Sequence, residues 1–120
     1  MNRIKMLVYI LPRGKGEELS SLAADEGVAF RLVLHGKGTA ASDILTLLGI
    51  GDVDKDIMLL TVDEERSEYV FRKLGDKMEL KRIGGGIGFS IPLSAVANQS
   101  IVYDLLAGNL SKVPTERSGK

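Results

Sequence analysis

The chain contains no cysteine, and it has no excess of charge of either sign. Without cysteine there can be no disulfide, no thiolate metal site and no cysteine nucleophile, and the composition is typical of a reducing compartment. Sixteen Lys and Arg residues balance 16 Asp and Glu residues, so no overall positive field attracts nucleic acid. A length of 120 residues favours a single domain that oligomerisation can stabilise further.

Long hydrophobic runs are also missing. The apolar run near the N-terminus, residues 6–11, stops at Pro12, which is too short for a signal peptide or a membrane span. We therefore expect a soluble, cytoplasmic protein that does not insert into membranes.

Sequence patterns of the common catalytic sites are missing as well. There is no serine elbow, no Walker sequence and no dinucleotide fingerprint, so we expect no enzyme. His35 is the only histidine, and we interpret it as a structural or hydrogen-bonding residue. The acidic residues 51–56 favour a solvated turn over a Ca²⁺ or Mg²⁺ loop, and no transition-metal site is expected.

The order of apolar and amphipathic segments predicts the fold. We expect strands at 3–11, 28–36, 56–62 and 86–96, with Pro92 marking an edge strand or a strand end. Helices are expected at 14–27 and at 63–77, the second carrying an inward stripe of Val70, Phe71 and Leu74 and ending at Gly75. A short helix over 100–109 and a disordered tail over 110–120 follow. The order β-α-β-β-α-β is the ferredoxin-like α+β fold, a four-stranded antiparallel sheet with two helices on one face.

Both faces of the central strands are apolar. In the first strand Ile4, Met6, Val8 and Ile10 alternate with Leu7, Tyr9 and Leu11. Two helices cover only one face, and a bare apolar sheet face is rare on a monomer. The sequence therefore predicts a homo-oligomer.

The segment from Gly36 to Lys55 is long and apolar for a connection between two strands. Thr39 or Ser42 can cap a short helix that ends at Gly49 and Gly51. The residues that would dock on a protein partner are Ile44, Leu45, Leu47, Leu48 and Ile50. The alternative is a small helix that packs these side chains on its own domain or on a neighbouring copy.

A glycine run, Gly84, Gly85, Gly86 and Gly88, leads into the last strand. Consecutive glycines let backbone N–H groups converge on an anion, and Lys81, Arg82 and Lys37 could add charge. The alternative is a run that only allows close backbone packing at the start of a strand.

Together these segments resemble the nitrogen regulatory proteins P-II, the PII family of trimeric signal transducers. The resemblance covers about residues 1–97. It rests on Gly36-Lys37-Gly38, where the family's T-loop begins, on "TVDEE" after the third strand, and on "GGGIGF" at Gly84–Phe89. It implies a ferredoxin-like domain over 1–109, with 36–55 as a T-loop-like insertion.

The resemblance also implies a function. Members bind adenine nucleotides between subunits and regulate transporters, enzymes or transcription factors through the T-loop. By this resemblance the effector is AMP, ADP or ATP, and the target is a transporter or a metabolic enzyme. The nucleotide-binding residues it implies are Gly36, Lys37, Gly38, Thr39, Arg82, Gly84, Gly85, Gly86 and Gly88.

This chain departs from the family pattern at two cationic positions. Ile87 replaces the family's phosphate-binding lysine, and Asn98 and Ser100 stand near the family's later arginine pair. Fewer cations favour AMP or ADP over ATP. Two other functional classes stay open: a ligand-free CutA-like trimeric scaffold, and an acylphosphatase-type enzyme that would use Arg13.

Overall fold

The computed structural model of the protein describes residues 3–37 and 54–97. In chain order these residues form β1 (Ile4–Pro12), α1 (Gly16–Asp25), β2 (Arg31–Lys37), β3 (Asp54–Asp63), α3 (Glu64–Lys77) and β4 (Ile87–Pro92). This order confirms the predicted ferredoxin-like α+β fold. The short helix predicted at 100–109, the tail at 110–120 and most of the 36–55 segment lie outside the described residues.

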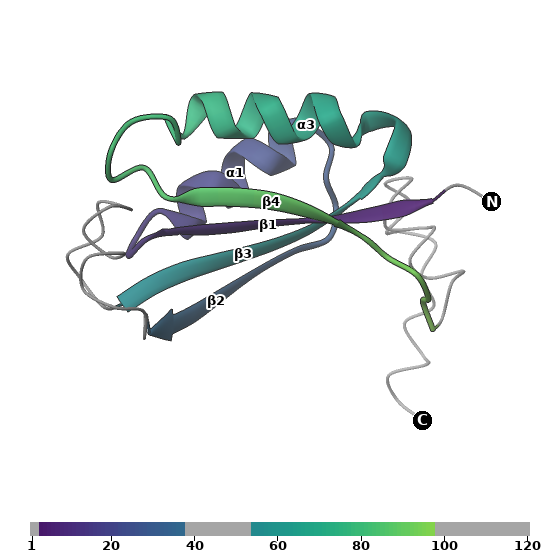
Figure 1. Ribbon diagram of the computed structural model, residues 1–120, viewed down its shortest axis with the longest axis horizontal. Coiled ribbons are helices and arrows are strands. Elements are labelled where there is room, and N and C mark those ends of the chain that lie inside the picture. The colour runs from purple at the N-terminus through teal and green to yellow at the C-terminus, as the bar shows by residue number, and fades with distance from the viewer. Residues whose placement is uncertain (1–2, 38–53, 98–120) are drawn as a thin grey trace.

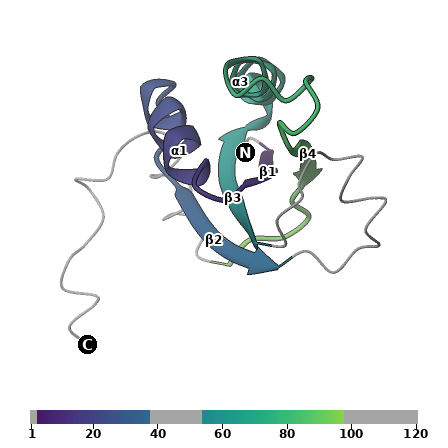
Figure 2. The ribbon, with the colours of Figure 1, turned by 90° about the vertical axis from the view of Figure 1, so that its left-hand side faces the viewer.

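The four strands form one sheet in the order β2-β3-β1-β4, and every neighbouring pair is antiparallel. Both helices lie on the same face of this sheet (Figure 1). Viewed end-on, α1 lies over the β2 side and α3 over the β4 side (Figure 2). The chain therefore has a helix layer on one face of the sheet, as the sequence predicted.

The core lies between the sheet and the two helices. Leu7, Tyr9 and Leu11 of β1 are fully buried, and their neighbours on β3 and the helices complete one cluster. The Tyr9 hydroxyl donates a hydrogen bond to the Phe71 carbonyl oxygen at 3.0 Å, and the two rings stack at a centroid distance of 5.6 Å. The predicted stripe of α3 is confirmed: Val70 and Leu74 are fully buried and Phe71 is partly buried.

Helix α3 begins with a local cap. Asp63 is its N-cap residue, and its side chain accepts a hydrogen bond from the Glu65 N–H. The helix does not end at Gly75 as the sequence suggested but continues to Lys77. Glu79 supplies the left-handed turn, with φ of 57°, that ends the helix two residues after Lys77.

Two strands are shorter than predicted, for identifiable reasons. β2 begins at Arg31 because Val28 bonds back to Ala23 and closes the end of α1. β4 ends at Pro92, which has no N–H for a further ladder bond. β4 is also an edge strand, so the prediction made from Pro92 is confirmed on both counts.

Candidate functional site

Four chain segments meet at one end of the sheet. β1 ends there at Pro12, β2 ends at Lys37, β3 begins at Asp54 and β4 begins just after the glycine run. The ends of β2 and β3 border the 38–53 segment. Every residue of the predicted nucleotide site that the structure describes lies at this end.

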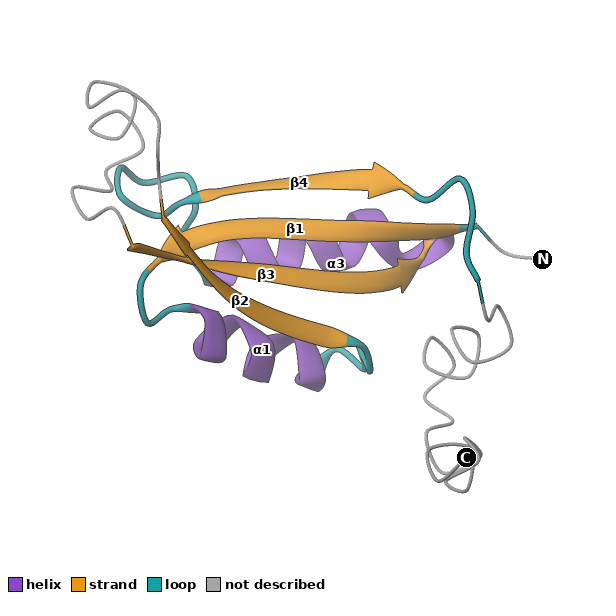
Figure 3. Cartoon of the chain, turned by 90° about the horizontal axis from the view of Figure 1, so that it is seen from below, coloured by secondary structure: helices purple, strands orange, loops and turns teal. Residues whose placement is uncertain are grey.

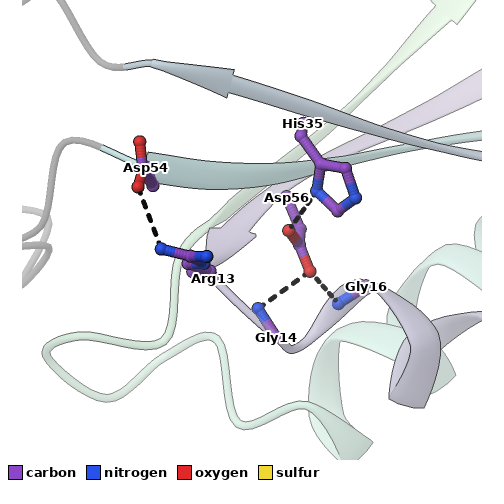
Figure 4. A network of polar contacts seen from close by, with 6 residues as sticks. All are labelled: Arg13, Gly14, Gly16, His35, Asp54 and Asp56. Carbon is purple, nitrogen blue, oxygen red and sulfur yellow. Dashed lines mark hydrogen bonds and ion pairs between the residues drawn. The ribbon is translucent and has the colours of Figure 1, made fainter.

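A buried carboxylate, Asp56, organises the site. Its side chain is 2 % exposed, and its Oδ2 atom accepts hydrogen bonds from the Gly14 N–H at 2.9 Å and the Gly16 N–H at 2.8 Å (Figure 4). Lys15, the N-cap residue of α1, makes no side-chain capping bond. Asp56 therefore caps α1 from a strand that lies 40 residues away in the chain.

The same carboxylate holds a histidine. Asp56 Oδ1 lies 3.0 Å from His35 Nδ1, and the His35 side chain is 81 % exposed. Burial favours a raised pKa for Asp56, but the hydrogen bonds from Gly16, His35 and Gly14 outweigh it, so the pKa of Asp56 lies below its usual value. Asp56 is therefore an anion that caps α1 and orients His35, the hydrogen-bonding role expected for this histidine.

The glycines of this loop have specific steric roles. A Cβ atom on Gly16 would lie 2.8 Å from Val33 Cγ1 and 3.0 Å from Asp56 Oδ2. Gly14 has open space around it but a φ of +91°. The "PRGKG" turn thus needs glycine twice, once for space and once for backbone conformation.

A pocket of about 310 Å³ opens beside His35, lined by Arg13, His35, Gly36, Lys37, Asp54 and Lys55. The Arg13 guanidinium forms an ion pair with Asp54 at 3.1 Å. Gly36 and Lys37 of the predicted nucleotide site lie here. Gly38 and Thr39 lie outside the described residues, as do the predicted partner-binding residues Ile44, Leu45, Leu47, Leu48 and Ile50.

The glycine run lies on the opposite edge of the sheet from Lys37. Gly84, Gly85 and Arg82 line a pocket of about 220 Å³, and Gly86 and Gly88 line one of about 470 Å³ together with Lys81. β3 and β1 separate the two edge strands, a span of about 14 Å at the usual strand spacing. Within one chain, Lys37 and the glycine run therefore line different pockets.

Packing alone accounts for three glycines of the run. A Cβ atom on Gly85 would lie 2.4 Å from the Glu79 carbonyl oxygen, and one on Gly86 would lie 2.5 Å from that of Ile10. A Cβ atom on Gly88 would lie 2.8 Å from the Tyr9 ring. The close packing considered as the alternative to an anion cradle is present, and an anion-binding role would come in addition to it.

The acidic residues of the 51–56 segment that the structure describes already have partners. Asp54 pairs with Arg13, and both oxygens of Asp56 contact N–H groups or the His35 ring. Across residues 3–37 and 54–97, no group of three or more His, Cys, Asp or Glu residues could hold a metal ion.

The second face of the sheet is apolar in successive rows. One row places Val8 beside Leu59 and Phe89, and Leu32 beside Leu59; the next joins Ile10, Ile57, Leu34 and Ile87 in the same way. Seen from below in Figure 3, this face lies in front of both helices and neither covers it. The side chains of Leu32, Leu34, Ile87, Phe89 and Ile91 are each about 40 % exposed. The predicted bare apolar face is present.

Sequence reasoning missed the role of Asp56. It grouped this residue with a solvated turn, whereas the structure buries it beneath α1. Two signals were available: a helix start with no capping side chain in "PRGKGEEL", and an aspartate directly before the apolar run "IMLL". Neither signal says that the two segments meet.

No family model matches the sequence, and no curated protein matches it. Solved structures do share its fold. Arabidopsis thaliana PII bound to citrate superposes with a TM-score of 0.62 at 18 % identity, over 82 % of this chain and 86 % of that one. The B. subtilis GlnK–ATP complex superposes with a TM-score of 0.58 at 15 % identity, over 83 % and 91 %.

A Bacillus cereus protein related to NIF3 also matches, with a TM-score of 0.58 at 14 % identity. The match covers 78 % of this chain but only 26 % of that longer protein. Identities this low establish the fold alone. None of the helices in the described part of this chain is long and apolar enough to span a bilayer. The chain has a divergent version of the ferredoxin-like fold that PII and GlnK share.

Proposed function

We propose that this protein is a PII-like regulator that assembles as a homotrimer, binds an adenine nucleotide between subunits and controls a protein partner through residues 36–55. The observation that carries the proposal is the apolar sheet face that no helix covers, on a fold shared with PII and GlnK. Burying such a face against neighbouring copies removes its exposed leucine, isoleucine and phenylalanine side chains from water.

Assembly also supports a shared nucleotide site. Gly36 and Lys37 lie on one edge of the sheet and the glycine run on the other, so the two halves can meet where the edge of one copy approaches the opposite edge of the next. The phosphates would contact backbone N–H groups of residues 84–88, with Lys81, Arg82 and Lys37 supplying charge. The B. subtilis GlnK structure contains ATP, which supports a nucleotide as effector; AMP or ADP suits the smaller number of cations here.

In this proposal the protein is a sensor, not a catalyst, that acts in the cytoplasm. Residues Ile44, Leu45, Leu47, Leu48 and Ile50 contact a transporter or a metabolic enzyme. The second candidate is a ligand-free CutA-like trimer. The tight packing of Gly85, Gly86 and Gly88 favours it, because that packing explains these glycines without a ligand.

Light scattering and calorimetric titration with AMP, ADP and ATP test the proposal. We expect trimeric mass and saturable binding. Alanine at Gly85 or Gly86 is unsuitable as a probe, since its Cβ atom would collide with backbone oxygens. Arg82→Gln is better, because Arg82 is 70 % exposed and pairs only with Glu79 among the salt bridges of the described residues.

The matched control is Arg3→Gln, which removes the same charge from the exposed residue just before β1, at the other end of the sheet. Binding should weaken by about fivefold or more in Arg82→Gln and stay unchanged in Arg3→Gln. A monomer in solution would refute the assembly. A trimer that binds none of the three nucleotides would favour the scaffold.

A further inference from the structure

The pocket beside His35 lies on the helix side of the sheet, beyond the first turn of α1. His35 and Lys37 alternate with Gly36 along β2, so both point to the face on which Asp56 caps the helix. Arg13 reaches the same place from the turn after β1. This pocket is separate from the pockets of the glycine run, which lie at the other edge of the sheet.

Asp56 fixes the orientation of the His35 ring. A carboxylate only accepts hydrogen bonds, so its contact with Nδ1 requires a proton on that nitrogen. The second nitrogen, Nε2, then lies on the ring edge turned away from Asp56 (Figure 4). Because the carboxylate is buried and already accepts two backbone N–H bonds, it cannot turn outward to follow the ring. The structure holds an exposed imidazole in place and leaves Nε2 facing solvent.

Cations dominate the groups that face this imidazole. Arg13 comes from the turn after β1, Lys37 from β2 and the buried Lys55 from β3. The acids are Asp54, paired with Arg13, and Asp56, whose oxygens are engaged behind the ring. Imidazole takes up a second proton near neutral pH, and Nε2 then becomes a donor next to Arg13 and Lys37.

We propose that this pocket is a proton-linked binding site for a phosphate-type oxyanion, held by His35 Nε2–H, the Arg13 guanidinium and the Lys37 ammonium group. Its volume of about 310 Å³ accepts an inorganic anion and also leaves room for a small ester substituent. Asp56 acts here as a positioning residue, because it touches His35 and not the ligand. The ligand draws Arg13 toward it and away from Asp54.

Such a ligand would join the end of β2 to the turn before α1. Both strands that border the 38–53 segment contribute to the pocket, β2 through His35 and Lys37 and β3 through Asp54 and Lys55. Occupancy therefore changes the ion pairs at both ends of this segment. The site provides an input that is separate from a nucleotide bound at the glycine run.

The single histidine makes the proposal directly testable. The imidazole resonances of His35 are followed by NMR while the intact protein is titrated with sodium sulfate, whose charge stays constant across the pH range used. Titrations at about pH 6 and about pH 8 separate the two charge states of imidazole. Parallel titrations with inorganic phosphate and with ribose 5-phosphate distinguish a free anion from a phosphate monoester.

We expect saturable shifts of the His35 resonances, with affinity at least about fivefold higher at the lower pH. Arg13→Gln should weaken sulfate binding by about fivefold, and Arg3→Gln should change it less than twofold. Arg13 is 70 % exposed, so its replacement should not unfold the protein. Shifts that grow linearly without saturating, an equal effect of the two arginine variants, or affinity independent of pH would each overturn the proposal. Nucleotide calorimetry on the same samples is scored separately.

Discussion

Replacing Asp56 should separate its charge from its hydrogen bonds. Asp56→Asn keeps the shape and one acceptor oxygen, whereas Asp56→Ala removes every acceptor beneath the start of α1. In both variants the Gly14 and Gly16 N–H groups stay in place, because the turn that carries them is set by the backbone. The pair of variants therefore measures what a remote carboxylate contributes to a helix without a local cap.

The expected sizes follow from the two short bonds. A hydrogen bond to a charged acceptor contributes about 1.5–3 kcal/mol net, and a neutral one about 0.5–1.5 kcal/mol. With its oxygen toward Gly14 and Gly16, asparagine exchanges two bonds of the first kind for two of the second, a loss of about 2 kcal/mol. Alanine leaves two buried N–H groups without an acceptor, a loss of about 3–5 kcal/mol.

Urea unfolding followed by circular dichroism gives both differences, at fixed protein concentration because assembly adds to apparent stability. The pH dependence has a definite sign. The pKa of Asp56 is lower in the folded protein than in the unfolded chain, so its ionised form stabilises the fold above the unfolded value of about 3.9. This stabilisation is lost as the pH falls through the folded pKa, and the gap between the parent protein and Asp56→Asn should close there.

Two results would contradict this reasoning. If Asp56→Ala costs less than about 1 kcal/mol, the N–H groups of the turn find other acceptors and the carboxylate is not their essential partner. If Asp56→Asn and Asp56→Ala cost the same, the charge carries the whole effect and the retained oxygen contributes nothing. A gap that stays constant down to low pH would show that the folded and unfolded pKa values of Asp56 do not differ.

Three further predictions concern single residues. Gly16→Ala should lower the free energy of unfolding by about 2–3 kcal/mol in urea titrations, because its Cβ atom would press on Val33 and Asp56, whereas Gly14→Ala should cost about 1 kcal/mol through its left-handed φ; equal costs would refute the steric argument. Gly85→Ala should cost about 3 kcal/mol or more by the same assay, since the Glu79 carbonyl oxygen occupies the space, and a neutral result would show that this turn relaxes freely. Phe89→Glu should convert the assembly to monomers in light scattering without changing the circular dichroism spectrum, because a charge on the apolar face cannot be buried; an unchanged mass would exclude this face as the interface.

Most of the fold could be predicted from the sequence because its elements carry local signals. Alternating apolar residues mark β1 and β3, and acidic residues followed by an apolar stripe mark α3. The end of α3 was misplaced because Gly75 is tolerated inside the helix, while Glu79, an unremarkable residue by type, takes the left-handed conformation. Helix ends of this kind depend on conformation and not on composition.

The site was less predictable because its contacts are distant in the chain. Gly36, Lys37 and the glycine run were located at the correct end of the sheet by their positions next to strands. The strand order then put them on opposite edges, which no local pattern encodes. Asp56 was missed because its partners, Gly14 and Gly16, donate through their backbones and leave no pattern of side-chain types to detect.

The remote cap also bears on the order of folding. Helix α3 carries its own cap in Asp63 and can begin to form from local contacts alone. Helix α1 has no such start, so its first turn is completed only after β3 has been brought to it, at the entropic cost of closing a loop of 40 residues. We therefore expect α3 to be structured in the transition state and α1 to consolidate late. Substitutions at Asp56 should accelerate unfolding while leaving the folding rate nearly unchanged.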